Sequence, residues 1–177
     1  WNYGNLPQSQ VYSLASDAAG RLYAATNRGV FRSLNRGVGW ELTLHDWYEF
    51  SPPVFSVAVA PNGHVFAGTN YQAGEFRGAW RSTDGGATWV RIRDDGGAPL
   101  CVDPSGRLFA SRADGEGMSR SLDEGDTWEP LPLSNTYVTA LAATRLGTTF
   151  AATSVGVFLT LDRGESWQRL GLGCERL

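Results

Sequence analysis

The chain has 177 residues, of which 42% are hydrophobic and 12% aromatic, with 22 glycines against 8 prolines. This length is sufficient for one domain with its own core, and the composition favours an all-β protein rich in tight turns. The net charge of −3 argues against a nucleic-acid binder, and no stretch approaches the roughly 18 apolar residues of a membrane span.

One eight-residue motif recurs four times along the chain and ends each time in tryptophan. Its copies are SLNRGVGW (33–40), STDGGATW (82–89), SLDEGDTW (121–128) and TLDRGESW (160–167). The tryptophans are spaced by 49, 39 and 39 residues, which indicates a tandem repeat. In such repeats each copy is one supersecondary unit that buries its hydrophobic surface against its neighbours.

Two apolar segments precede each copy of the motif. The first segments are VYSLAS (11–16), VFSVAV (54–59), PLCV (99–102) and VTALAA (138–143). The second segments are GRLYAAT (20–26), GHVFAGT (63–69), GRLFASR (106–112) and GTTFAAT (147–153). A third run lies just before the motif and a fourth begins after its tryptophan, so each unit contains four short strands separated by turn residues. Four strands per repeat predict the blades of a β-propeller.

We therefore predict a single all-β region over residues 1–177, a β-propeller of four-stranded antiparallel blades. The predicted blades cover approximately residues 11–46, 53–95, 98–133 and 137–172. Residues 1–7 are expected to be the outer strand of a preceding blade. Because an open array exposes strand edges that invite association, we expect a larger propeller or closure with another copy of the chain.

The motif resembles the Asp-box, Ser-x-Asp-x-Gly-x-Thr-Trp, of sialidases, sortilin-type receptors, photosystem II assembly factors and xyloglucan-degrading endoglucanases. The second and third copies match completely, whereas Asn35 and Gly39 replace Asp and Thr in the first. The resemblance implies a secreted or periplasmic bacterial setting. It also implies structural roles for Asp84, Trp89, Asp123, Trp128, Asp162 and Trp167. The chain lacks the Phe/Tyr-Arg-Ile-Pro stretch of sialidases, so the resemblance does not extend to their active site.

The motif has the chemistry of a hairpin turn, since an aspartate can accept hydrogen bonds from backbone amides just ahead of it. Arg32, Arg81 and Arg120 each stand directly before a motif. One interpretation is that they pair with acids of a neighbouring blade, and the other is that they form an anion-binding stripe. His64 lies in a turn, and the sequence indicates no role for it.

Two insertions, at 43–53 and 70–78, interrupt the period. By strand parity both lie at the end of the blades opposite the motif, where loop variation favours function. Flat rings mixed with charged groups are typical of carbohydrate or peptide sites. With one residue from the matching turn of the third unit, the candidate ligand-binding residues are His45, Asp46, Trp47, Tyr48, Glu49, Tyr71, Glu75, Arg77 and Arg112. The alternative is that Trp47 and Phe50 anchor their own loop as a small satellite core.

The sequence thus favours a non-catalytic binding or scaffold module with a carbohydrate or a protein or peptide as ligand. The alternative is a glycoside hydrolase, whose carboxylate pair would come from Glu49, Glu75, Asp114 and Glu116. The two histidines and two cysteines show no metal-ligand spacing, so we expect neither a metal ion nor a cofactor.

Overall fold

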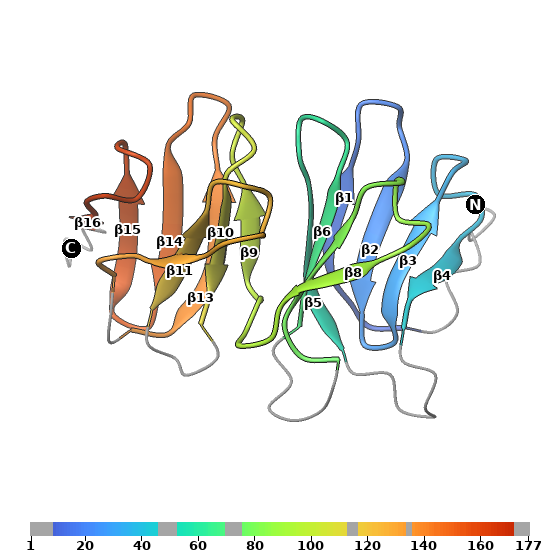
Figure 1. Ribbon diagram of the computed structural model, residues 1–177, viewed down its shortest axis with the longest axis horizontal. Coiled ribbons are helices and arrows are strands. Elements are labelled where there is room, and N and C mark those ends of the chain that lie inside the picture. The colour runs from blue at the N-terminus through green and yellow to red at the C-terminus, as the bar shows by residue number, and fades with distance from the viewer. Residues whose placement is uncertain (1–8, 46–52, 70–75, 113–116, 134–135, 172–177) are drawn as a thin grey trace, which may run out of the picture.

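The computed structural model describes residues 9–45, 53–69, 76–112, 117–133 and 136–171 (Figure 1). These residues form four antiparallel four-stranded sheets, each made of four consecutive strands. We call the sheets the first to fourth blades in chain order. Figure 1 shows them side by side, from the first blade at the right to the fourth at the left. The chain therefore has the β-propeller fold that the repeat predicts.

Every blade runs from an inner first strand to an outer fourth strand. The first strands are β1 (Val11–Ser16), β5 (Val54–Val59), β9 (Leu100–Val102) and β13 (Val138–Ala143). The second strands are β2 (Leu22–Thr26), β6 (Val65–Thr69), β10 (Leu108–Ser111) and β14 (Thr149–Thr153). The third strands are β3 (Gly29–Ser33), β7 (Ala79–Ser82), β11 (Met118–Ser121) and β15 (Gly156–Thr160). The fourth strands are β4 (Glu41–Leu44), β8 (Val90–Arg93), β12 (Glu129–Pro130) and β16 (Gln168–Leu170).

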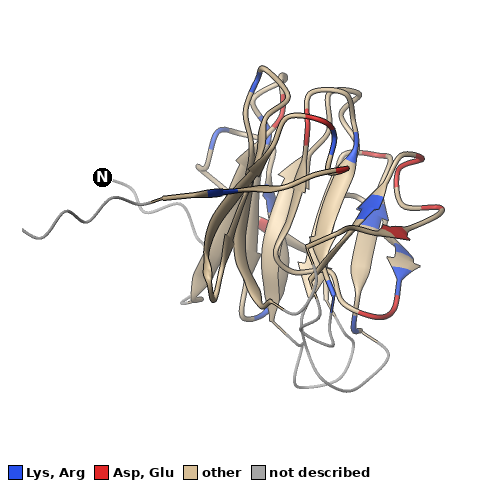
Figure 2. Cartoon of the chain, turned by 90° about the vertical axis from the view of Figure 1, so that its left-hand side faces the viewer, with Lys and Arg blue, Asp and Glu red and all other residues tan. Residues whose placement is uncertain are grey.

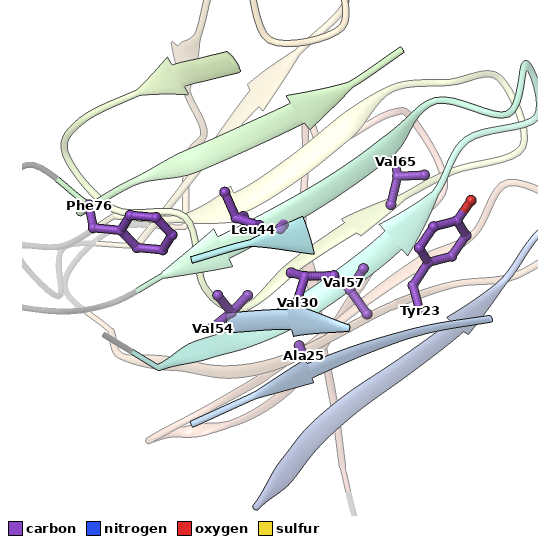
Figure 3. Packing of buried hydrophobic residues seen from close by; sticks show 9 residues of the cluster. Tyr23, Ala25, Val30, Leu44, Val54, Val57, Val65 and Phe76 are labelled. Atoms are coloured by element: carbon purple, nitrogen blue, oxygen red, sulfur yellow. The ribbon is translucent and has the colours of Figure 1, made fainter. Parts of the chain in front are cut away.

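The hydrophobic core lies between successive blades rather than in one central cluster. One cluster joins the first and second blades (Figure 3), a second joins the second and third, and another joins the third and fourth. Each blade contributes an aromatic side chain from its second strand, and in the first three blades these are fully buried: Tyr23, Phe66 and Phe109. Small neighbours such as Ala24 and Ala67 are also fully buried, because two sheet faces meet there closely.

The register of the second and third strands sets which side chains face the next blade. Tyr23 pairs with Arg32, Phe66 with Arg81 and Phe109 with Arg120. Paired residues of neighbouring strands lie on the same face of a sheet. The arginine before each of the first three motifs therefore projects toward the following blade, beside the core that the two blades share. In the fourth blade the equivalent pair is Phe150 and Leu159.

Within the described ranges no helix is long and apolar enough to cross a bilayer. Residues 1–7, which the sequence predicts as the outer strand of a preceding blade, lie outside the described residues.

Candidate functional site

The eight-residue motifs form the turns between the third and fourth strands, and we call them box turns. In the second blade the carboxylate of Asp84 accepts hydrogen bonds from the amides of Ala87 (3.0 Å) and Thr88 (2.8 Å) and from the Thr88 hydroxyl (2.6 Å). The Ser82 hydroxyl donates to Asp84 at 2.8 Å and accepts from the Gly86 amide at 2.7 Å. These bonds, above all the one from the Thr88 hydroxyl, hold the pKa of Asp84 well below its usual range.

The box turns of the third and fourth blades repeat this arrangement. Hydrogen bonds from Thr127 and Ser121 lower the pKa of Asp123 to about 2. Those from Ser166 and Thr160 lower the pKa of Asp162 to about 2. An acid this strong stays ionised and is unsuited to donate a proton near neutral pH.

The first blade keeps the same turn without the charge. Asn35 Oδ1 accepts from the Gly39 amide at 2.7 Å and from the Ser33 hydroxyl at 3.0 Å. The Ser33 hydroxyl in turn accepts from the Gly37 amide at 2.8 Å. The carbonyl oxygen of the asparagine side chain is thus sufficient for the turn geometry.

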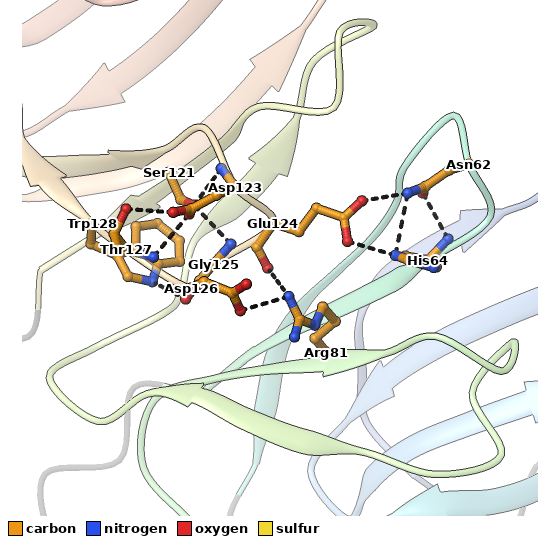
Figure 4. A network of polar contacts seen from close by, with 10 residues as sticks. All are labelled: Asn62, His64, Arg81, Ser121, Asp123, Glu124, Gly125, Asp126, Thr127 and Trp128. Carbon is orange, nitrogen blue, oxygen red and sulfur yellow. Dashed lines mark hydrogen bonds and ion pairs between the residues drawn. The ribbon is translucent and has the colours of Figure 1, made fainter.

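The box turns also bind the preceding blade, and the sequence did not show how. Arg32 donates to the carbonyl of Gly85 at 2.9 Å, and Arg81 donates to the carbonyl of Glu124 at 3.0 Å (Figure 4). Arg120 donates to the carbonyl of Arg163. The acceptor is always the fourth residue of the next box turn. That residue has a left-handed backbone, with φ of 61° at Glu124, which directs its carbonyl toward the arginine.

Each of these arginines also has a carboxylate partner. Arg32 binds Glu41 of its own blade. Arg81 binds Asp126, the sixth residue of the next box turn, at 3.0 Å. We call the contact between two successive blades a joint. In the joint between the third and fourth blades, Arg120 binds Glu129 of its own blade and Glu165 of the next blade. Arg81 and Arg120 therefore pair with acids of the neighbouring blade, in agreement with the first interpretation, whereas Arg32 reaches that blade only through the carbonyl of Gly85.

The turns between the first and second strands lie at the same end as the box turns. In the first and third blades an aspartate of that turn binds its own arginine, as in the pairs Asp17–Arg21 and Asp103–Arg107. In the second blade His64 occupies the arginine position, and its Nδ1 lies 2.9 Å from Glu124 of the third box turn (Figure 4). We call this end the box face.

A hollow of about 330 Å³ opens on the box face where the four first strands end. Its lining includes the matching residues Ser16, Val59, Val102 and Ala143. The two carboxylates of its lining, Asp17 and Asp103, are already bound to arginines, and the lining also includes Thr144 and Arg145.

The opposite end of the blades carries those predicted ligand-binding residues that the structure describes. His45 directly follows β4, Arg77 precedes β7 and Arg112 directly follows β10. All three are partly buried, and the Nε of Arg77 is buried without a hydrogen-bond partner. The other predicted residues lie outside the described residues: Asp46, Trp47, Tyr48, Glu49, Tyr71 and Glu75. The same holds for Asp114 and Glu116 of the predicted carboxylate set.

Sequence reasoning missed a buried arginine at this end. Arg93 ends β8 at the position that Leu44 and Leu131 occupy in the first and third blades, and its side chain is only 5% exposed. Comparison of the fourth strands along the repeat would have revealed it. Across the joint stands Ser119, where the other blades have an aromatic residue such as Trp80. The guanidinium group of Arg93 therefore lies beside Ser119, at the place where the other joints have an aromatic ring.

The contacts of Arg93 cross from the second blade to the third. Its guanidinium binds Asp95, donates to the Ser119 hydroxyl at 3.3 Å and lies 4.8 Å from the centre of the Trp128 ring. The Nη1 group is buried without a partner. The hydrogen bond from Arg93, and to a lesser extent the charge of Arg112, lower the pKa of Asp95. Among the described residues, no group of three or more His, Cys, Asp or Glu side chains could hold a metal ion.

Comparison with known proteins supports the fold. No protein-family model matches the chain, and no curated protein matches it. A GH74 enzyme from Niastella koreensis is similar, with a TM-score of 0.70 and 20% identity over 90% of this chain and 30% of that chain. An extracellular domain from B. thetaiotaomicron has a TM-score of 0.69 and 13% identity over 99% of this chain and 23% of that chain. YCF48 bound to D1 peptide has a TM-score of 0.62 and 17% identity over 91% of this chain and 53% of that chain.

The chain spans about a quarter to a half of the length of these three structures. At identities of 20% or less the similarity establishes the architecture alone. The proteins that share this architecture include a GH74 enzyme and YCF48, which was solved with a bound peptide.

Proposed function

We propose that the chain is a non-catalytic binding or scaffold module whose ligand surface lies on the face opposite the box turns. The observation that carries the proposal is a pair of charged residues at that end, where the other blades have apolar residues. There Arg93 and Asp95 replace an apolar joint, and Arg112 lies close enough to lower the pKa of the same aspartate. The first and third blades have Leu44 and Leu131 at the position of Arg93, so the fold does not require a buried charge there. Such a charge is typical of surfaces kept for recognition.

The box face is a poor alternative for the same role. Its box aspartates accept hydrogen bonds from hydroxyl and amide donors, as at Asp84 and Asp123. The arginines that precede the box turns bind the neighbouring blade, and Arg21 and Arg107 bind aspartates of their own turns. Groups that already satisfy each other have little left to offer a ligand.

The chemistry at the opposite face suits a ligand rich in hydrogen-bond acceptors, a peptide or protein segment or a carbohydrate. Guanidinium groups such as Arg77 and Arg112 recognise carboxylates and carbonyls by their fixed fork of donors. The aromatic residues predicted for the two insertions, Trp47 among them, would provide stacking surfaces. A similar fold binds a peptide in YCF48, and another serves as an extracellular domain. We accordingly infer an extracellular or periplasmic setting.

The test is a glycan and peptide array probed with the wild type and with matched variants. We expect Arg112→Ala and Trp47→Ala to reduce binding of the selected ligand at least about tenfold, the usual loss at a central contact. Arg145→Ala, on the exposed box face, serves as the control and should leave binding unchanged. Binding that survives both first substitutions, or that is lost in the control, contradicts the proposal.

The second candidate is a glycoside hydrolase with a carboxylate pair on the same face, since enzymes occur among the similar folds. Hydrolysis needs two carboxylates separated by roughly 5 to 10 Å across the scissile bond. A panel of aryl glycosides, assayed with the wild type and with Glu49→Gln and Glu75→Gln, separates the candidates. Turnover that either substitution abolishes favours the enzyme, and absence of turnover by the wild type excludes it.

A further inference from the structure

The hollow on the box face is built from three consecutive positions of every blade, the last residue of the first strand and the first two residues of the turn that follows it. The four first turn residues in its lining are Asp17, Ala60, Asp103 and Thr144. The four second turn residues in its lining are Ala18, Pro61, Pro104 and Arg145. Because equivalent positions line the hollow, a blade whose sequence differs at one of them gives the hollow a different chemistry.

The two acids of the lining are covered by their own turns. The side chain of Asp103 is 0% exposed and that of Asp17 is 4% exposed. Each binds the arginine of its turn and also accepts a hydrogen bond from the amide of that arginine, at 2.9 Å in Arg21 and 3.0 Å in Arg107. Figure 2 shows positive and negative residues together on the turns of this end, at the top of the view. Neither carboxylate is therefore available to a ligand.

The turn of the fourth blade has a different charge pattern. Thr144 stands where the first and third blades have their acid, and Thr148 stands where they have their arginine. The cation of this turn is instead Arg145, at a position that lines the hollow and is apolar in the other three blades. Arg145 is exposed and, in the part of the chain that the structure describes, forms no hydrogen bond or ion pair. It therefore gives the hollow one positive charge that no acid of its own turn neutralises.

Two hydroxyl groups add hydrogen-bond donors to the same lining. The hydroxyl of Thr144 accepts from the amide of Thr148 at 3.2 Å, which leaves its own proton for another acceptor. Ser16 is exposed and lines the hollow from the first blade. The hollow thus offers a guanidinium group and two hydroxyls, whereas both carboxylates of its lining are covered.

The remaining walls of the hollow are largely apolar. They include Val59, Val102 and Ala143 and the two prolines Pro61 and Pro104. Small-molecule sites combine such walls with a small number of polar groups and have volumes of about 300 to 1,000 Å³. The volume of about 330 Å³ places this hollow at the small end of that range.

We propose that the hollow binds a small organic acid with one carboxylate and an apolar body, and that Arg145 receives the carboxylate. A guanidinium group donates two parallel hydrogen bonds to a carboxylate, and the hydroxyls of Ser16 and Thr144 supply further donors. A single available cation favours a ligand with one negative charge over a phosphate group with about two. The site goes beyond the proposed ligand surface, because it lies on the box face and uses none of the residues proposed for the opposite face.

The test is a titration of the isotope-labelled chain, followed by amide NMR shifts, with butyrate, hexanoate, benzoate and phenylacetate. We expect at least one of these acids to bind saturably with a Kd of about 1 mM or lower. The shifts should occur at amides of the hollow such as those of Gly63 and Arg145. The matching carboxamide should bind at least about tenfold more weakly, because it lacks the charge that the guanidinium group recognises. Inorganic phosphate should also bind more weakly than the selected acid.

Matched arginine variants assign the site. Arg145→Gln should weaken binding of the selected acid at least about tenfold, because it removes the positive charge. Arg36→Gln, at an exposed arginine of the first box turn that is not part of the lining, should leave the affinity unchanged. Arg112→Ala, on the opposite face, should also leave it unchanged, so that this proposal and the proposed function fail separately.

Four outcomes overturn the proposal. They are the absence of saturable binding for every acid, equal binding of the acid and its carboxamide, tighter binding of phosphate, and equal effects of Arg145→Gln and Arg36→Gln.

Discussion

The imidazole Nδ1 of His64 lies 2.9 Å from the carboxylate of Glu124 and so joins the first turn of the second blade to the box turn of the third. In the first and third blades the cation of this turn binds an aspartate of its own turn, but in the second blade Ala60 stands in that place. The next blade provides the missing acid. Neighbouring blades are thus matched to each other at single residues.

A double-mutant cycle of His64→Ala and Glu124→Ala measures this match. Both side chains are partly exposed, so we expect a coupling free energy of about 0.5–1 kcal/mol in urea unfolding. The coupling should shrink at high ionic strength, which screens exposed pairs. Additive effects of the two substitutions would show that the contact contributes nothing to stability.

Removal of an arginine that links two blades should lower the free energy of unfolding more than loss of the His64–Glu124 contact does. Arg120 is 7% exposed and holds a carbonyl and two carboxylates across the joint between the third and fourth blades. Arg120→Ala should lower the free energy of unfolding by about 1–2 kcal/mol, because the carbonyl of Arg163 loses its donor and the two carboxylates, 51% and 69% exposed, lose a charged partner. Arg145→Ala, on the exposed box face, is the matched control and should change stability by less than about 0.5 kcal/mol. Equal effects would contradict a role of Arg120 as a tie between blades.

Two glycines with similar backbone angles distinguish the cost of a left-handed backbone from the cost of a steric collision. Gly106 has a φ of 83° and open space around it, whereas Gly125 has a φ of 97° and a Cβ there would collide with Ile92 of the preceding blade. Gly106→Ala should cost about 1–2 kcal/mol from the left-handed backbone alone. Gly125→Ala adds overpacking, for a total of about 3 kcal/mol or more. Chemical denaturation measures both, and an equal loss would mean that the third box turn does not pack against the second blade.

The box aspartates predict a loss of stability in acid. The pKa of Asp123 and of Asp162 is about 2 in the folded chain, against a usual value of 3.8. A lowered folded pKa stabilises the chain at pH values above the unfolded pKa, and this contribution is lost as the pH falls from about 4 to 2. The variant Asp123→Asn/Asp162→Asn should be less stable than wild type at pH 7, and the difference should narrow by pH 2.5. A difference independent of pH would contradict the assignment.

Arg93 and Ser119 occupy positions where the other joints have a leucine and an aromatic residue, and substitution can restore that pair. Arg93→Leu leaves Ser119 without its partner, and Ser119→Phe crowds the guanidinium, so each alone should cost about 2 kcal/mol. Together they recreate the leucine–aromatic joint of the other blades. We expect the double variant to recover at least about 1 kcal/mol relative to the sum of the singles. Strict additivity in thermal or urea unfolding would show that the two positions are not matched.

The sequence alone determined the architecture of this protein. A period marked by tryptophan, with four apolar runs in each unit, admits few folds other than blades, because strand alternation and turn chemistry are local properties. Local chemistry also predicted that the box aspartates close turns, and hydrogen bonds such as that from Thr88 to Asp84 occur where the motif places them.

Only the tertiary structure decided what the turns contact. The carbonyl of Glu124 receives Arg81 because two blades meet with a particular register, and no residue pattern within one blade specifies that meeting. For the same reason the sequence did not reveal the roles of His64 and Arg93. Each of them contacts a residue of the next blade, more than 20 residues along the chain. Local sequence specifies each blade, whereas the packing of one blade on the next specifies the chemistry between them.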